Sequence, residues 1–242
     1  MRGIALDLSM SKTIPIVVVP GLGSSVRTHL EILPALWRRG PVTVANPIGE
    51  DTIAAMAKYA LDEAPAGPFA LIGHSLGGYI ALEIMRQAPQ RVGRLLLMNT
   101  QARTDPREVT ERRLATIAII RQGRFEEAME ANFPMLVHPS RVDDETLRQR
   151  MRLTRQDVGA EAYLRQQAAI MGRIDQRPFL KDIAVPTLVV SGDADRLIPL
   201  EGSREMAELI PRAKLEIIAQ CGHLTPLEQP EALIEAMEEW LD

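Results

Sequence analysis

A strand-like apolar run that ends in a glycine-rich turn, and leads at once into a helical pattern, is the feature that most constrains this chain. The run covers residues 69–72 and the turn reads GHSLG over residues 73–77. A turn this sharp strains the backbone at Ser75, so the residues two before and two after it must be small. Gly73 and Gly77 meet that requirement. The spacing predicts a buried strand, an outward-facing serine and a helix whose N-terminus favours negative charge on a reacting oxygen.

Short apolar or β-branched runs alternate with helical patterns on both sides of this turn. Such alternation predicts a mainly parallel sheet with helices on both faces, and it places ligands at the carboxyl ends of the strands. Strands are expected at residues 14–19, 42–45, 69–72, 95–98, 186–190 and 215–218. Helices are expected at residues 24–39, after a cap at Asp51, and at residues 75–87, 200–209 and 230–241.

The alternation stops after the strand that ends near Met98, where only helical patterns follow. Asp105 as a cap and Pro106 as the first helical residue begin this run, with helices expected near residues 106–122, 125–132, 144–156 and 160–172. The sequence therefore predicts a core of residues 1–102 and 178–242 with a helical cap of residues 103–177 inserted between them. Apolar side chains of the cap are expected to line the substrate pocket and set its chain-length preference; those singled out are Phe125, Met129 and Phe133.

Composition narrows the range of partners. The length of 242 residues fits one core with an insertion. The 28 basic and 32 acidic side chains nearly balance, which gives no reason to expect nucleic acid or a membrane as partner. A single cysteine excludes an intrachain disulfide, and neither a leader-like run in residues 1–13 nor a stretch of about 18 apolar residues is present. A cytoplasmic protein is expected, and the sequence leaves open whether it forms a homodimer. No metal-ligand spacing is found, so neither a metal nor another cofactor is expected.

Three polar residues each follow the carboxyl end of an expected strand. They are Ser75, Asp195 and His223, and they occur along the chain in the order serine, aspartate, histidine. Since the carboxyl ends of parallel strands meet at one edge of the sheet, we expect their side chains to converge.

With these residues in place, the chain resembles the α/β-hydrolase fold family nearly from end to end. Four motifs carry the resemblance: PGLG at 20–23, GHSLG at 73–77, GDAD at 192–195 ahead of Pro199, and GH at 222–223. The resemblance implies an α/β-hydrolase fold with Ser75 as nucleophile, His223 as general base and then acid, and Asp195 as the carboxylate that orients the imidazole. It also implies an oxyanion hole made by the backbone N–H groups of Leu22 and Leu76, with Gly21 beside the substrate.

The family pattern also separates two neighbouring aspartates. It selects Asp195 as the acid, because that residue lies between Gly192 and Pro199 at the expected spacing. Asp193 is then expected to bond nearby backbone N–H groups as a turn former.

The chain departs from the family at three places. Pro20 stands where the family usually has histidine, few residues precede the first expected strand, and the loop after the second lacks the usual arginine and glycine. We therefore expect a smaller sheet with the initial antiparallel strands missing or reduced.

Four further residues receive structural roles. His74 is expected to pack and hydrogen-bond away from Ser75, and Cys221 to be a small buried side chain. His29 and His138 are expected at the surface or at helix caps.

The parts fit acyl transfer, because a serine hydroxyl becomes a good nucleophile when an imidazole accepts its proton and fixed donors hold the oxyanion. The favoured function is a carboxylesterase-like serine hydrolase for small to medium, largely uncharged esters. A serine at the turn argues against the dehalogenase and epoxide hydrolase branches, which use aspartate there. The alternatives are an acyltransferase, a lactonase or a carbon–carbon bond hydrolase with the same three residues, or a slow-turnover ligand-binding signalling protein.

Overall fold

The computed structural model describes residues 13–242. The expectations that fall on residues 1–12, namely the lack of a leader and the reduced antiparallel strands ahead of the first parallel strand, lie outside the described residues.

A six-stranded sheet in the order β2-β1-β3-β4-β5-β6 runs through the described part of the chain, and every strand pair is parallel. Its central strands are apolar and β-branched because both faces are covered; all six residues of β3 are buried. The predicted fold class is confirmed. The strands are β1 Ile16–Val19, β2 Val42–Val44, β3 Phe69–His74, β4 Val92–Met98, β5 Thr187–Gly192 and β6 Ala213–Ile218.

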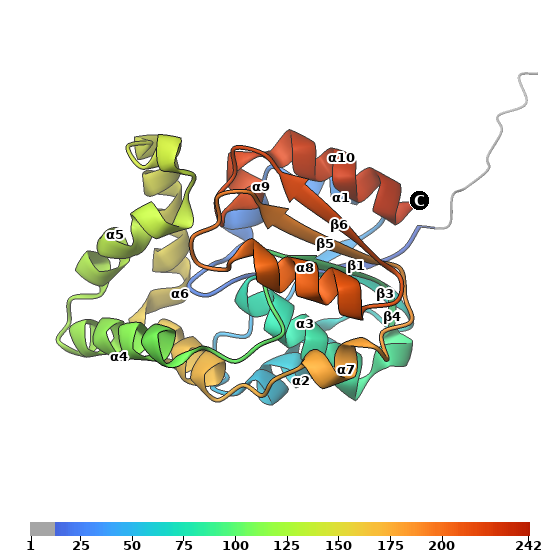
Figure 1. The fold of residues 1–242 in the computed structure, drawn as a ribbon, viewed down its shortest axis with the longest axis horizontal. Helices are drawn as coiled ribbons and strands as arrows, with labels where there is room; N and C mark the ends of the chain where they lie inside the picture. The colour runs from blue at the N-terminus through green and yellow to red at the C-terminus, as the bar shows by residue number, and fades with distance from the viewer. Residues whose placement is uncertain (1–12) are drawn as a thin grey trace, which may run out of the picture.

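Helices cover the two faces of the sheet (Figure 1). Alternate strand residues such as Val17 and Leu71 pack against α2, α3 and α8, whereas Val18 and Ile72 pack against α1 and α10. The helices outside the insertion are α1 Leu33–Trp37, α2 Ile53–Glu63, α3 Leu76–Gln87, α7 Arg177–Leu180, α8 Leu200–Leu209, α9 Thr225–Glu228 and α10 Pro230–Leu241, with 3-10 turns η1 Val26–His29 and η2 Pro89–Arg91.

The expected insertion is helical. It contains α4 Arg107–Arg121, α5 Phe125–Leu136, a 3-10 turn η3 Pro139–Arg141 and α6 Glu145–Met171, which lie together at the side of the molecule toward which β5 and β6 point (Figure 1). Gly159 has φ 77° inside α6, so this element is two helices joined at a kink, as the sequence predicts. The boundaries of a separate cap at residues 103 and 177 remain a prediction.

The expected helix over residues 24–39 is wrong. The structure has the short η1 turn, followed by α1 with Pro34 as its second residue. Proline lacks an N–H group, and its ring clashes with the carbonyl four residues earlier, so a continuous helix through Pro34 is disfavoured. The chain restarts the helix just ahead of the proline, where the missing donor costs nothing.

Two predicted caps also differ. The N-cap of α2 is Thr52, whose side chain accepts from the Ala55 N–H at 3.2 Å, and not Asp51. Helix α4 begins at Arg107 after Pro106. Asp105 does not cap it, because its carboxylate accepts from the guanidinium groups of two arginines of the insertion instead.

His29 is the clearest misplacement, since it was expected at the surface or at a cap and is fully buried. Its Nδ1 lies 2.8 Å from the Thr28 hydroxyl, while Nε2 has no hydrogen-bond partner in residues 13–242. Burial lowers the pKa of His29 from 6.5 to about 4, because the charged imidazolium would lose its hydration.

This burial predicts a loss of stability in mild acid. The unfolded chain protonates His29 near its ordinary pKa of 6.5 and the folded chain only near 4, so the unfolded state binds more protons between these values. Stability is therefore intact above pH 6.5 and falls as the pH drops toward 4. At about pH 5 the contribution of His29 is a loss of about 2 kcal/mol in the free energy of unfolding.

Urea unfolding of wild type and His29→Gln at about pH 7.5 and about pH 5 measures this term. The difference between the two pH values should shrink by about 2 kcal/mol in the variant. His138→Gln, at a partly exposed histidine, should behave as wild type does. The same pH dependence in wild type and His29→Gln would contradict the assignment.

In the described part of the chain, each helix is either too short or too polar to span a bilayer.

Candidate active site

Ser75 occupies the sharp turn between β3 and α3. Its backbone has φ 55° and ψ −115°, a conformation that non-glycine residues rarely adopt. A Cβ on Gly73 would lie 2.5 Å from the Gly77 carbonyl oxygen, and one on Gly77 would lie 2.7 Å from the carbonyl carbon of Val19. The predicted need for small residues on both sides of the serine is therefore confirmed.

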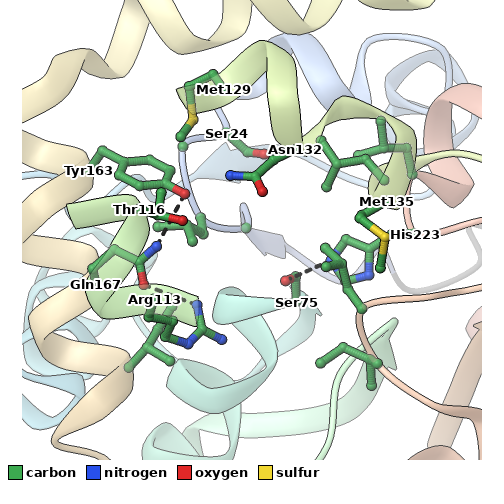
Figure 2. Close-up of a pocket in the computed structure, with 18 of the residues that line it drawn as sticks. Ser24, Ser75, Arg113, Thr116, Met129, Asn132, Met135, Tyr163, Gln167 and His223 are labelled. Atoms are coloured by element: carbon green, nitrogen blue, oxygen red, sulfur yellow. Dashed lines mark hydrogen bonds between the residues drawn. The ribbon is translucent and has the colours of Figure 1, made fainter. Parts of the chain in front are cut away.

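The structure brings the three converging residues of the sequence into one hydrogen-bonded row. With its proton on Nδ1, His223 donates to Asp195 Oδ2 at 2.7 Å and accepts from Ser75 Oγ at 2.9 Å through Nε2. Figure 2 shows Ser75 and His223 side by side in the wall of a pocket, joined by this hydrogen bond. In this arrangement a proton can pass from the serine hydroxyl to the imidazole while the carboxylate holds the ring in place.

Asp195 is held as a carboxylate. Its Oδ1 accepts from the backbone N–H groups of Leu197 at 2.9 Å and Ile198 at 3.0 Å. Burial raises the pKa of Asp195, but the charge and hydrogen bond of His223, together with bonds from Ile198 and Asn99, outweigh burial and leave the pKa below its usual value. The side chain is therefore ionised when it orients His223.

Asp193 has a different role. Its two carboxylate oxygens accept from the N–H groups of Gln220 and Cys221, each at 3.0 Å. The expected backbone bonding is confirmed, although the bonded groups lie in the loop that carries His223. Asp193 thus ties the loop after β5 to the loop after β6.

Asn99, at the end of β4, supports the acid and was not predicted from the sequence. Its Nδ2 donates to Asp195 Oδ2 at 3.0 Å and to the Gly222 carbonyl at 3.2 Å, and its Oδ1 accepts from Thr225 at 2.6 Å. Asn99 has φ 48°, which asparagine tolerates better than most residues. An asparagine directly after a buried strand, at the same sheet edge as Ser75 and Asp195, is the signal that could have identified it.

Glu228 fixes the backbone on both sides of His223. Its Oε1 accepts from the N–H groups of Gly222 at 3.0 Å and Leu224 at 3.2 Å, while Oε2 accepts from the His138 N–H at 2.7 Å. The His223 N–H itself donates to the Leu136 carbonyl at 2.9 Å. The histidine loop is therefore bonded both to α9 and to the end of α5.

The other expected structural residues behave largely as predicted. His74 Nε2 donates to the His223 carbonyl at 2.9 Å, and the two rings lie 5.5 Å apart, so His74 packs behind the site. His138 is the cap of η3. Cys221 is fully buried, and burial raises the pKa of its thiol to about 12, which keeps it protonated and unreactive.

The loop that contains Gly21 lies directly against the serine. A Cβ on Gly21 would lie 3.1 Å from Ser75 Cβ. In residues 13–242 the Leu22 N–H has no hydrogen-bond acceptor, and Leu76 is the first residue of α3, so its N–H has no partner within the helix. Both N–H groups are available for an oxyanion, and their use there remains a prediction.

A cavity of about 180 Å³ opens beside Ser75 and His223. Gly21 lines it after β1 and Ser75 after β3, where the strand order reverses and open α/β sheets bind ligands. Helices α4, α5 and α6 supply most of the opposite wall; the residues labelled in Figure 2 from these helices are Arg113, Thr116, Met129, Asn132, Met135, Tyr163 and Gln167.

Of the three cap residues expected to line the pocket, the structure brings only Met129 to its wall. Phe125 packs edge-on against Tyr163, with ring centroids 5.6 Å apart. Phe133 is fully buried among apolar residues of α6 and the segment after His223, and its ring lies under Arg148 at 4.3 Å. The two phenylalanines therefore pack against neighbouring helices and not against the pocket. Helical periodicity shows which side chains share a face, but not what that face contacts.

Within residues 13–242, no group of three or more histidine, cysteine, aspartate or glutamate side chains is arranged to hold a metal ion.

Known proteins similar to this chain are hydrolases with the same fold. A family model described as the alpha/beta hydrolase fold matches residues 19–230. The pimeloyl-[acyl-carrier protein] methyl ester esterase of Photobacterium profundum is 26% identical over 93% of this chain and 94% of its own. The 2-hydroxy-6-oxononadienedioate/2-hydroxy-6-oxononatrienedioate hydrolase of Paraburkholderia xenovorans is 27% identical over 81% of this chain and 69% of its own.

Among solved structures, a thermophilic esterase from Thermogutta terrifontis, with malate bound, superposes with a TM-score of 0.85 and 27% identity. The match covers 94% of this chain and 89% of the esterase. With a family model spanning most of its length, a six-stranded parallel sheet and relatives that are hydrolases, this chain belongs to the α/β-hydrolase fold family.

Proposed function

We propose that the chain is a serine hydrolase that cleaves carboxylic esters through an acyl-enzyme on Ser75. The observation that carries the proposal is the unbroken hydrogen-bonded row from Ser75 Oγ through His223 to Asp195, which opens onto a pocket. Two relatives support the same class of reaction: one is named a methyl ester esterase and the other a hydrolase.

In the proposed reaction, Ser75 Oγ attacks the ester carbonyl carbon while His223 Nε2 takes the hydroxyl proton. The N–H groups of Leu22 and Leu76 would hold the oxyanion of the tetrahedral intermediate. When the intermediate collapses, the carbon–oxygen bond to the alcohol breaks and His223 protonates the leaving oxygen. A water molecule then attacks the acyl-serine with the same assistance, which releases the acid and restores Ser75.

The helical segment 103–177 acts as a cap in this proposal. Helices α4, α5 and α6 supply the wall that faces the serine, so substrates must fit between them and the sheet edge. Met129 then takes part in substrate binding, whereas Phe125 and Phe133 support the cap from behind.

Carbon–carbon bond hydrolysis is the second candidate. The relative from Paraburkholderia xenovorans is named a hydrolase of 2-hydroxy-6-oxononadienedioate, a diacid that carries a ketone group. The same three side chains would serve there. Fast release of alcohol from simple esters favours the first candidate, and turnover confined to ketonic diacids favours the second.

Covalent labelling tests the proposal directly. A fluorophosphonate probe followed by peptide mass spectrometry should modify Ser75, because its hydroxyl alone in this pocket is bonded to an imidazole and a carboxylate in series. Ser75→Ala should take up no label. Equal labelling of Ser24, which lines the same pocket, would contradict the assignment of the nucleophile.

A further inference from the structure

The pocket wall that faces the serine is cationic. Its lining includes Arg112 and Arg113 from α4 and Arg155 from α6, and no aspartate or glutamate is among the residues that line it. Figure 2 shows Arg113 on the side of the pocket away from His223, next to Gln167, with Tyr163 farther along the same wall. An uncharged substrate gives no reason for guanidinium groups on this wall, since polar groups buried beside an apolar ligand lose hydration without gaining a partner.

Arg155 is the most unusual of these residues. Its side chain is 3% exposed, and its Nη1 has no hydrogen-bond partner in the described part of the chain. The nearest carboxylate, Glu130, lies 3.6 Å from that nitrogen, and it is bonded more closely by Arg148 at 2.9 Å and Arg152 at 3.3 Å. Glu130 thus faces three guanidinium groups, of which Arg148 also lies 3.6 Å from Glu145, and Arg155 is left buried with one shared carboxylate near it.

Arg113 also has an unused donor directed to the same cavity. Its Nε donates to Asp105 at 2.6 Å and its Nη1 donates to Gln167 at 3.0 Å, whereas no bond within residues 13–242 uses Nη2. Asp105 is shared with Arg173, which donates to its other oxygen at 2.8 Å. This cluster too has more positive charge than negative.

A buried guanidinium that is poorly paired destabilises a protein unless a further negative charge compensates it. Arginine remains protonated in proteins, so Arg155 cannot avoid this cost by losing its proton. Glu130, at 3.6 Å and shared with two other arginines, compensates the charge only in part, and a negative group that enters the pocket would complete the compensation. Two guanidinium groups on one wall suit the two oxygens of a carboxylate, whereas a phosphate monoester presents three oxygens and a charge of about −1.5 to −2.

We propose that the pocket selects substrates with a carboxylate in addition to the scissile ester, and that Arg155 and Arg113 bind this carboxylate while Ser75 attacks the ester. The inference rests on the proposed function for the ester half and is independent of it for the carboxylate half. It replaces the expectation of a largely uncharged substrate with a class of half-esters of dicarboxylic acids.

Matched substrates test the selection. Monomethyl esters of dicarboxylic acids of increasing length are compared with methyl esters of monocarboxylic acids of the same length. For the best length, wild type should show a kcat/KM about 10- to 100-fold higher for the half-ester, the effect of a hydrogen bond between charged groups. Equal or lower kcat/KM for every half-ester would overturn the proposal.

Variants assign the effect to residues. Arg155→Met and, independently, Arg113→Met should each bring the ratio of kcat/KM for the half-ester to kcat/KM for the neutral ester close to 1, because KM for the half-ester rises. Arg152→Met is the matched control, because it removes a guanidinium on the same helix and from the same carboxylate, but Arg152 does not line the pocket. Loss of the preference in Arg152→Met, or its retention in both pocket variants, would overturn the assignment. Thermal unfolding checks that each variant is folded.

Direct binding separates failure of the subsite from failure of the proposed function. Calorimetry with adipate, which carries a carboxylate and no ester, should show binding to wild type and to Ser75→Ala, and none to Arg155→Met. If no ester is cleaved but adipate binds in this way, the esterase proposal fails and the carboxylate subsite stands. If esters are cleaved and adipate does not bind, the subsite proposal fails alone. Methyl phosphate that binds as well as adipate would overturn the choice of carboxylate.

Discussion

Replacing Ser75 with alanine is expected to lower kcat for ester hydrolysis by on the order of 10⁶, as the loss of the nucleophile does in serine-protease templates. The hydroxyl is the only Ser75 group bonded to His223, so alanine removes the reacting atom and leaves the turn intact. Alanine and serine tolerate the positive φ at this position about equally, so the melting temperature should change little.

Ser24→Ala is the matched control, since Ser24 is buried in the wall of the same pocket but its hydroxyl has no bond to His223. Initial rates on a neutral ester and on a half-ester should both fall in Ser75→Ala and be largely kept in Ser24→Ala. A Ser75→Ala protein with most of its esterase activity would exclude Ser75 as the nucleophile.

Replacing Asp195 with asparagine is expected to cost on the order of 10⁴ in kcat. The carboxylate accepts the Nδ1 proton of His223 at 2.7 Å, which leaves Nε2 free to accept the serine proton. An asparagine amide can turn its NH₂ group toward Nδ1 and so favour the tautomer with the proton on Nε2, where it blocks the transfer. Asparagine also cannot stabilise the imidazolium by charge.

Asp193→Asn provides the comparison, two residues away in the same loop. Asparagine there keeps one acceptor oxygen and loses the other, so one of the bonds from Gln220 or Cys221 is broken. The expected result is a loss of about 1 kcal/mol in stability with little change in kcat. Kinetics and melting temperatures of the two variants should be measured side by side. If catalysis is lost in Asp193→Asn and kept in Asp195→Asn, the assignment of the acid is reversed.

The parts of the fold that the sequence predicts are those set by local chemistry. Strand β3, the turn at Ser75 and helix α3 follow from an apolar run, two glycines and a helical pattern. The glycines are needed because a Cβ on Gly77 would clash with the backbone of Val19. The convergence of Ser75, Asp195 and His223 follows from the parallel sheet, which brings the ends of distant strands to one edge.

The features that the sequence does not predict depend on which surfaces meet. Phe133 and Met129 lie one helical turn apart on α5, yet Met129 lines the pocket and Phe133 does not. His29 is buried because of packing by segments distant in sequence, and periodicity carries no information about them. The same holds for Asp105, whose role is fixed by Arg113 and Arg173 and not by its position before a helix.

The hydrogen bonds that join the end of α5 to the histidine loop limit which parts of the helical segment 103–177 can be replaced without moving His223. The Leu136 carbonyl and the His138 N–H are bonded to the segment of residues 223–228, and a Cβ on Gly222 would lie 2.5 Å from the Val137 carbonyl carbon. A chimera that exchanges residues 103–177 as one interchangeable module would disturb the geometry of His223 along with the pocket wall. Changes on the pocket faces of α4 and α6 are therefore the most direct way to alter the substrate range. Residues 136–138 should be kept, because they hold the histidine loop in place.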